Sequence, residues 1–143
     1  MTNQEKIKYL RRYRDNEREI ARLQEEIVQT EALSQKVTVS LGGAGGSNGE
    51  DKLQVAVERI VALQNGLTAQ VIKRVRLRGE IERAVMTVDD ERLQQLLRYR
   101  YINGKTWEQI AVNMNYSYKQ VCRLHGKALD VLECPIAGML LLR

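Results

Sequence analysis

The sequence predicts an all-helical protein in which two long helices precede a module of three short helices. Apolar residues recur at helical spacing along most of the chain, and a glycine-rich run divides its first half. In the second half, Thr106 with Gln109 and Ser117 with Gln120 have the spacing of a capping box, in which two residues satisfy each other's free backbone amides at a helix start. These three observations fix the expected order of elements.

The first helix of the module is predicted over residues 88–102. Its acidic start (Asp89, Asp90 and Glu91) suits the positive end of a helix, and Asn103-Gly104 is a typical helix end. Its buried stripe is expected to consist of Leu93, Leu96 and Leu97.

The next two helices have the pattern of a helix-turn-helix. The apolar residues on the two sides of the turn are Ile110, Ala111, Met114, Val121 and Leu124. Ala111 is small where the helices cross, and Asn115 can adopt the left-handed backbone usually given to glycine. Ala128 and Leu132 continue the stripe, which predicts that the last helix runs to about Glu133 before Pro135.

The outward face of this last helix carries the candidate binding residues. With Val121, Leu124 and Ala128 inward, a helical wheel places Lys119, Arg123 and Gly126 outward. An arginine in a DNA major groove can donate two hydrogen bonds to one guanine, and Tyr118 or Gln120 can contact a base edge or a phosphate. A merely solvated helix face is the alternative interpretation, and the flanking capping boxes and packing residues favour DNA.

Residues 98–111 (RYRYINGKTWEQIA), Tyr116-Ser117 and residues 127–129 (KAL) resemble region four, the promoter-reading domain of sigma factors. The resemblance covers residues 88–133. It implies that Tyr118, Lys119 and Arg123 reach bases and that Lys127 contacts the DNA backbone. The full set of expected DNA-contacting residues is Lys105, Thr106, Ser117, Tyr118, Lys119, Gln120, Arg123 and Lys127.

The whole chain resembles small phage and prophage proteins of Gram-positive bacteria related to the RinA-like and ArpU-like late transcription regulators. This implies a sequence-specific regulator, expected to activate phage late genes, with promoter or operator DNA and RNA polymerase as partners. The chain lacks the aromatic-rich domain with which full sigma factors melt promoters, so we do not expect it to open promoters alone. A small terminase-like packaging subunit, and an adaptor or inhibitor docking on polymerase or sigma, are the alternatives.

Residues 1–86 are expected to form a helical hairpin or coiled coil for oligomerisation or docking. Helices are predicted at about 3–35 and 51–86, joined by a flexible glycine-rich connector at 40–50. A phosphate-binding loop would need a preceding strand and a Gly-Lys-Ser/Thr ending, which this run lacks.

The stripes of these two helices predict their buried residues. The first is expected to bury Tyr13, Ile20, Leu23 and Ile27, interrupted by Asn16 and Thr30. The second is expected to bury Leu53, Val57, Ile60, Leu67, Val71, Ile81, Val85 and Val88, interrupted by Gln64, Arg74 and Arg78.

Apolar residues outside these stripes point to further contacts. Val55, Val61 and Val75 are left uncovered, which predicts a homodimer with two DNA-reading modules. The apolar tail at 134–143 is expected to cap the core or a subunit interface.

Composition narrows the function classes. A net charge of +5 permits nucleic acid as a partner, and Lys73, Arg74, Arg76 and Arg78 form a basic patch that is either phosphate-binding or simply solvated. No apolar run approaches the roughly 20 residues of a membrane span, and two cysteines are typical of a reducing compartment, so we expect a cytoplasmic protein in a bacterial host. Cys122, Cys134 and the single His125 cannot supply the four ligands of a zinc site without acidic residues. Cys122 with His125 is the only candidate pair for nucleophilic catalysis, and its place in the expected recognition helix favours packing or DNA contact. No metal, cofactor or enzymatic activity is expected.

Overall fold

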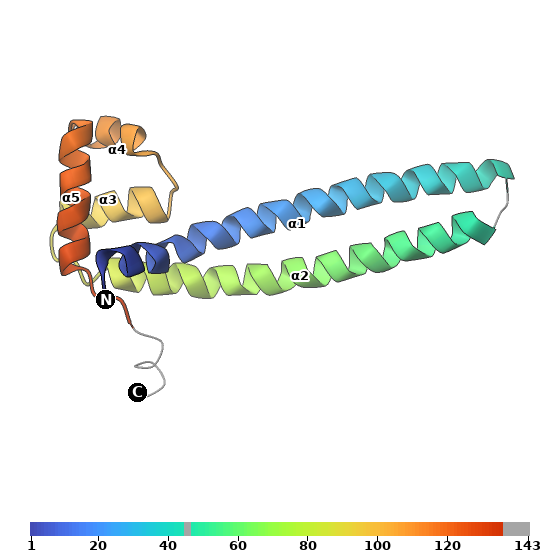
Figure 1. The fold of residues 1–143 in the computed structure, drawn as a ribbon, viewed down its shortest axis with the longest axis horizontal. Helices are drawn as coiled ribbons and strands as arrows, with labels where there is room; N and C mark the ends of the chain where they lie inside the picture. Colours follow the sequence, from blue (N-terminus) through green and yellow to red (C-terminus); the bar gives the residue numbers. More distant parts are fainter. Residues whose placement is uncertain (45–46, 136–143) are drawn as a thin grey trace. The chain divides into compact units, whose positions relative to one another are not determined.

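The protein is all-helical over the part of the chain that the structure describes. A computed structural model describes the backbone of residues 1–44 and 47–135 and the side chains of residues 1–37, 39 and 49–135. Within these residues lie α1 (Asn3–Ala44), α2 (Ser47–Val85), α3 (Glu91–Tyr101), α4 (Trp107–Met114) and α5 (Tyr118–Val131), with no strand among them (Figure 1).

The chain divides into two compact units. The two-helix unit comprises Asn16–Lys73, and the larger unit comprises Met1–Asp15 with Arg74–Arg143. In the two-helix unit, α1 and α2 run antiparallel: Asn16 bonds to Gln70, whereas Glu26, further along α1, pairs with Arg59, earlier in α2. Leu23, Ile27 and Leu63 form its small buried cluster, with Leu67 packed against it.

Asn16 is the one buried polar residue among those described in the two helices. Its side chain is 5% exposed, and its Nδ2 donates to the backbone oxygen and the side-chain Oε1 of Gln70, at 3.1 and 2.8 Å. A buried amide costs free energy unless it is hydrogen-bonded, so this pair favours one register of α1 against α2.

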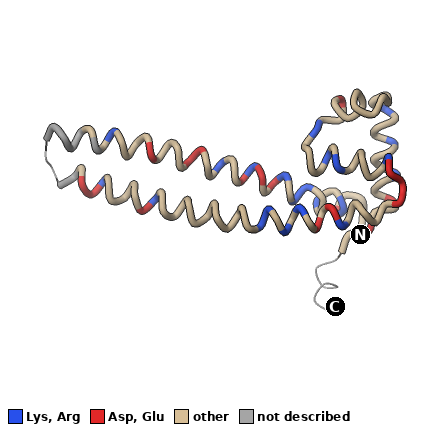
Figure 2. Tube along the Cα trace, turned by 180° about the vertical axis from the view of Figure 1, so that it is seen from behind, with Lys and Arg blue, Asp and Glu red and all other residues tan. Residues whose placement is uncertain are grey.

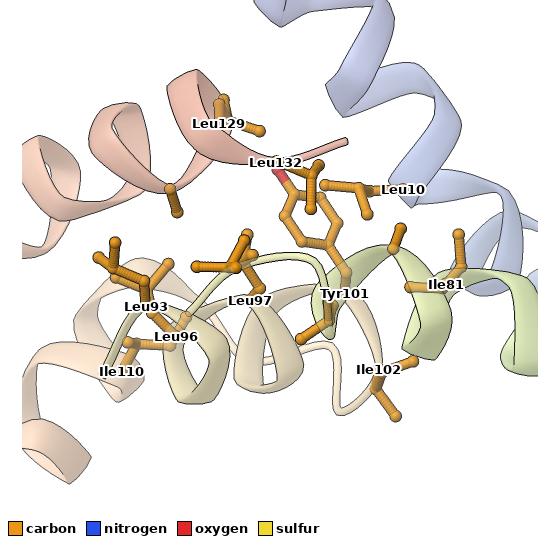
Figure 3. Close-up of a cluster of buried hydrophobic side chains, with 14 of the residues drawn as sticks. Leu10, Ile81, Leu93, Leu96, Leu97, Tyr101, Ile102, Ile110, Leu129 and Leu132 are labelled. Atoms are coloured by element: carbon orange, nitrogen blue, oxygen red, sulfur yellow. The ribbon is translucent and has the colours of Figure 1, made fainter. Parts of the chain in front are cut away.

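The core of the larger unit is built from all five helices. Figure 3 shows Leu10 and Ile81, from the segments of α1 and α2 in this unit, beside Leu97, Tyr101 and Leu132. The largest fully buried side chains of the described residues also include Leu77, Leu96, Ile110 and Val121. The expected stripe of α3 (Leu93, Leu96 and Leu97) is confirmed. The three short helices therefore rest on the ends of the two long ones within this unit.

Two predicted helix ends are wrong by a few residues. The helix expected at 88–102 begins at Glu91, because the Asp90 side chain caps it by accepting from the Arg92 amide at 2.9 Å. The helix expected to reach Glu133 ends at Val131, because Leu132 leaves in an extended conformation, with its side chain buried in the core. The backbone amide of Glu133, which follows the helix, instead donates to Thr87 Oγ1 at 2.9 Å.

The long helices extend beyond their predicted ends. α1 continues to Ala44 rather than residue 35, and α2 begins at Ser47, so most of the connector predicted at 40–50 is helical. Each glycine in a helix costs only about 1 kcal/mol relative to alanine, and a long helix can extend at that cost without forming a new nucleus. Residues 45–46 of this connector, and residues 136–143 of the expected tail, lie outside the described residues.

The buried stripe of α2 follows a different register from the predicted one. Leu63 and Leu77 are buried where Gln64 and Arg78 were expected to interrupt the seam, and Val57 is 50% exposed. From Leu53 onward, the inward positions follow alternating steps of three and four residues. This register includes Ala56 and excludes Val57. Leu53, Ile60, Leu67 and Ile81 belong to both registers. The predicted burial of Ile81, Val85 and Val88 is confirmed. In α1, the predicted Tyr13, Ile20, Leu23 and Ile27 are all buried.

Candidate nucleic-acid interface

The turn between α4 and α5 is the local structure that positions the candidate site. Asn115 has φ 57° and ψ 41°, the left-handed conformation expected from the sequence. Its amide reaches the carbonyls at the end of α4, and the Tyr116 amide donates to the Ala111 oxygen at 3.0 Å. Asparagine tolerates this conformation better than most non-glycine residues, so α4 stops here and α5 starts in a new direction.

Side chains on the inner face of α5 hold it against the other short helices. Val121, Leu124 and Ala128 are buried as predicted, and Leu129 joins them. Ile110 and Ala111 of α4 are buried beneath the turn. This packing determines which residues of α5 face solvent.

The outer face of α5 carries three exposed cations at one-turn spacing. Lys119, Arg123 and Lys127 are all exposed, and Tyr118 beside them is 52% exposed. Gly126, predicted to face outward, is half-exposed, and a Cβ built on it meets nothing within 4 Å. The result is a basic, sterically open helix face.

Both capping boxes predicted from the sequence are present, and they occupy three of the candidate side chains. Thr106 Oγ1 accepts from the Gln109 amide at 3.2 Å, and Ser117 Oγ accepts from the Gln120 amide at 3.1 Å. Gln120 Oε1 in turn accepts from the Ser117 amide at 2.9 Å. Each of these oxygens has used one of its two acceptor sites, so toward a phosphate Thr106, Ser117 and Gln120 would act through the donors that remain, the two hydroxyls and the Gln120 Nε2.

Lys105 contacts neighbouring helices of its own fold, unlike the exposed cations of α5. Its Nζ lies 4.7 Å from the centre of the Tyr99 ring and 3.4 Å from Asn113 Oδ1. It is half-buried against α3 and α4, so it is the candidate cation most constrained by its own fold.

His125 has a structural environment that the sequence did not reveal. Its Nε2 shares a hydrogen bond of 2.7 Å with the Tyr101 hydroxyl, and its ring centre lies 4.5 Å from that of Trp107. Burial lowers the pKa of His125 to about 4 and raises the pKa of Tyr101 to about 12. The Arg100 guanidinium, 4.3 Å from the Trp107 ring, further disfavours a charge on the histidine. His125 therefore joins α3, α4 and α5 as a neutral ring.

Cys122 and His125 do not form a pair. Cys122 is exposed on α5, where a hydrogen bond with Tyr118 raises the pKa of that phenol, while His125 faces Tyr101 and Trp107. In the described part of the chain, no three His, Cys, Asp or Glu residues come together as a possible metal site.

An open pocket of mixed polar and apolar lining between α3 and the α4–α5 turn was not anticipated from the sequence. It measures about 390 Å³ and is lined by Glu91, Arg92, Gln95, Tyr99, Asn113, Met114 and Tyr116. Arg92 lies within it, 3.4 Å from the Tyr116 hydroxyl and 3.3 Å from Asp90 Oδ2, and these contacts raise the arginine's pKa and lower that of Asp90. The only sequence signal was the clustering of arginine and tyrosine around residues 92–101.

The basic patch on α2 is a single helical run. Figure 2 shows the Lys and Arg residues gathered along this part of the helix, which are Lys73, Arg74, Arg76 and Arg78. Lys73 and Arg76 are exposed and Arg74 is half-buried. Arg78 lies 3.4 Å from Glu82 Oε1, which offsets part of its charge. These residues are not one uniform cationic surface.

Comparison with protein-family models, curated proteins and solved structures finds no match to this chain. Within the described residues, no helix combines the length and apolar character needed to cross a bilayer.

Proposed function

We propose that the chain is a sequence-specific DNA-binding regulator of transcription, with α4 and α5 as a helix-turn-helix and α5 as its recognition helix. In this proposal residues 88–133 are similar to region four of sigma factors. The observation that supports it best is the outer face of α5, where Lys119, Arg123 and Lys127 are exposed over the first three turns.

The roles of these residues follow from their chemistry. Arg123 has the planar, five-donor group that bonds to the O6 and N7 atoms of guanine, and each such contact contributes about 1–3 kcal/mol of discrimination. Lys119, one turn earlier, contacts a base or the neighbouring phosphate, and Lys127 contacts the backbone. Because the capping box already satisfies the amides of Ser117 and Gln120, the amides of Tyr118 and Lys119 are the ones a phosphate oxygen would approach.

The biological role belongs to the same proposal. Promoter or operator DNA is the partner of α5. Activation of phage late genes in a bacterial cytoplasm, with RNA polymerase as a further partner, is the role that the whole-chain resemblance to phage and prophage regulators implies. The basic run on α2 holds flanking phosphates.

Selection of duplexes from a random pool tests this function. The purified full chain should enrich one motif, and Lys119→Ala/Arg123→Ala should lose it while retaining helical content. Lys36→Ala/Lys52→Ala, which removes the same charge from exposed positions of the two-helix unit, is the matched control and should keep the motif. A folded chain that enriches nothing would contradict the proposal and favour a role in docking on polymerase or sigma.

A further inference from the structure

The solvent-facing side of α2 in the two-helix unit lacks charge over a long stretch. From Ile60 to Ile72 the helix carries no Asp, Glu, Lys or Arg, although 29% of the whole chain is charged. Exposed helix faces of water-soluble proteins normally carry charged side chains, so this stretch has the composition of a covered surface.

This uncharged side presents a second stripe, opposite the one that packs on α1. At 100° per residue, Val61, Asn65, Thr68 and Ile72 lie within a narrow sector, facing away from Leu63 and Leu67. All four are exposed, Val61 at 50% and Ile72 at 68%. Their steps of four, three and four residues are those of a coiled-coil seam. We call these four residues the outer stripe.

We propose that the outer stripe binds a second copy of this chain, α2 against α2, in antiparallel orientation. One two-fold axis between Gly66 and Leu67 places Val61 opposite Ile72 of the second copy and, at the same time, Asn65 opposite Thr68. The stripe is thus complementary to itself, as a two-fold interface requires. Ala62 and Ala69, both exposed, lie beside the stripe with small side chains that leave room for a second helix.

Charge selects the antiparallel orientation. Beyond the uncharged stretch, α2 enters the basic run Lys73, Arg74, Arg76 and Arg78. Parallel pairing would align this run with its own copy, and like charges in contact are destabilising. Antiparallel pairing instead brings Lys73 near Glu58 of the second copy. Glu58 is exposed and bonds at 3.2 Å only to the neutral Gln54 amide among its described contacts.

Sedimentation equilibrium of the full chain tests the association without reference to DNA. The wild type should have twice the 16.4 kDa chain mass at micromolar concentration. Val61→Lys/Ile72→Lys should sediment as a monomer, because each lysine faces another lysine across the axis, with helical content unchanged. Val28→Lys, at an apolar α1 residue that is 64% exposed and outside the stripe, is the control and should remain dimeric. A monomeric wild type, or a dimer that survives Val61→Lys/Ile72→Lys, would overturn the proposal.

Disulfide trapping tests the orientation. In a chain carrying Cys122→Ser/Cys134→Ser, the pair Asn65→Cys/Thr68→Cys should cross-link two chains under mild oxidation, since each thiol faces its complement. Gln54→Cys/Val57→Cys has the same spacing on the same side of the helix but lies far from the axis, so it should not cross-link. In parallel pairing every residue would face its own copy and both cysteine pairs would cross-link, so cross-linking of Gln54→Cys/Val57→Cys would overturn the assignment. Neither sedimentation nor disulfide trapping involves DNA. A monomeric chain would therefore leave the proposed DNA function standing, and a chain that binds no DNA would leave the proposed dimer standing.

Discussion

Single residues with unusual backbone or burial set the geometry of the short helices. Asn115, at φ 57°, ends α4, and Gly104, at φ 69°, follows α3, where an added Cβ would lie 2.3 Å from the Arg14 guanidinium. His125 is the third such residue, a neutral imidazole held by Tyr101 and Trp107. Each of them constrains the fold by conformation or by charge state rather than by bulk hydrophobicity.

The His125 environment predicts a pH dependence of stability. Its pKa is about 4 in the folded chain against the ordinary histidine value of 6.5, so between these values the unfolded chain binds the proton and the folded chain does not. The free energy of unfolding should therefore fall as the pH decreases from about 6.5 toward 4, by on the order of 2–3 kcal/mol from this group.

Urea unfolding of the wild type and His125→Gln across this pH range measures the effect. Glutamine has no group that titrates in this range, whereas the carboxylates are the same in both proteins. The free energy of unfolding should therefore fall less in the variant than in the wild type as the pH decreases. Identical pH profiles for the two proteins would contradict the assignment.

Gly126 offers a second prediction at this scale. The space around its Cβ position is open, so the fold does not require a glycine there. Gly126→Ala should raise the free energy of unfolding by about 0.5–1 kcal/mol, because alanine restricts the unfolded chain and suits a helix. A lower free energy of unfolding would show that an unrecognised contact is disturbed. Weaker DNA binding by a stabilised Gly126→Ala chain would place DNA close to this position.

At the scale of elements, the starts of α4 and α5 were the most predictable features. Thr106 with Gln109 and Ser117 with Gln120 form capping boxes as their spacing indicated, because a capping box depends only on residues close together in the sequence. The inward Val121, Leu124 and Ala128 and the exposed Lys119 and Arg123 follow from the same helical geometry.

The long helices were harder to predict, for a physical reason visible in α2. This helix has apolar residues on two opposite sides, so Val57 and Val61 compete with Leu63 in any register drawn from hydrophobicity alone. The packing partner decides between them, and it is distant in sequence. The environment of His125 was unpredictable for the same reason, since Tyr101 and Trp107 come from other helices.

The cap of α5 gives a prediction that separates folding from binding. Ser117→Ala removes the acceptor of the Gln120 amide and should lower the free energy of unfolding by about 1 kcal/mol. Ser117→Asp keeps an acceptor and places a negative charge at the positive helix end, so stability should be retained. The same carboxylate would repel a phosphate, so Ser117→Asp should weaken duplex binding. If Ser117→Asp bound the duplex as tightly as the wild type, the result would argue that the DNA backbone does not approach the start of α5.

At the scale of the whole molecule, the proposals assign separate tasks to the two units. The larger unit carries α5 and its exposed cations, and the two-helix unit carries the outer stripe. An inverted repeat in the selected DNA motif is expected if two copies bind one site, because a two-fold dimer matches two-fold related half-sites. A motif without such symmetry would argue that one copy binds alone.

In the proposed function, the outer face of α5 reads base sequence. Its most direct test is the ratio of affinities for the selected duplex and a scrambled duplex, measured at one fixed salt concentration. Arg123→Ala should reduce this ratio through one base position, by the equivalent of about 1–3 kcal/mol of discrimination free energy. Lys127→Ala should weaken binding to both duplexes alike and leave the ratio unchanged. An unchanged ratio for Arg123→Ala and for Lys119→Ala/Arg123→Ala would show that this face of α5 does not read base sequence.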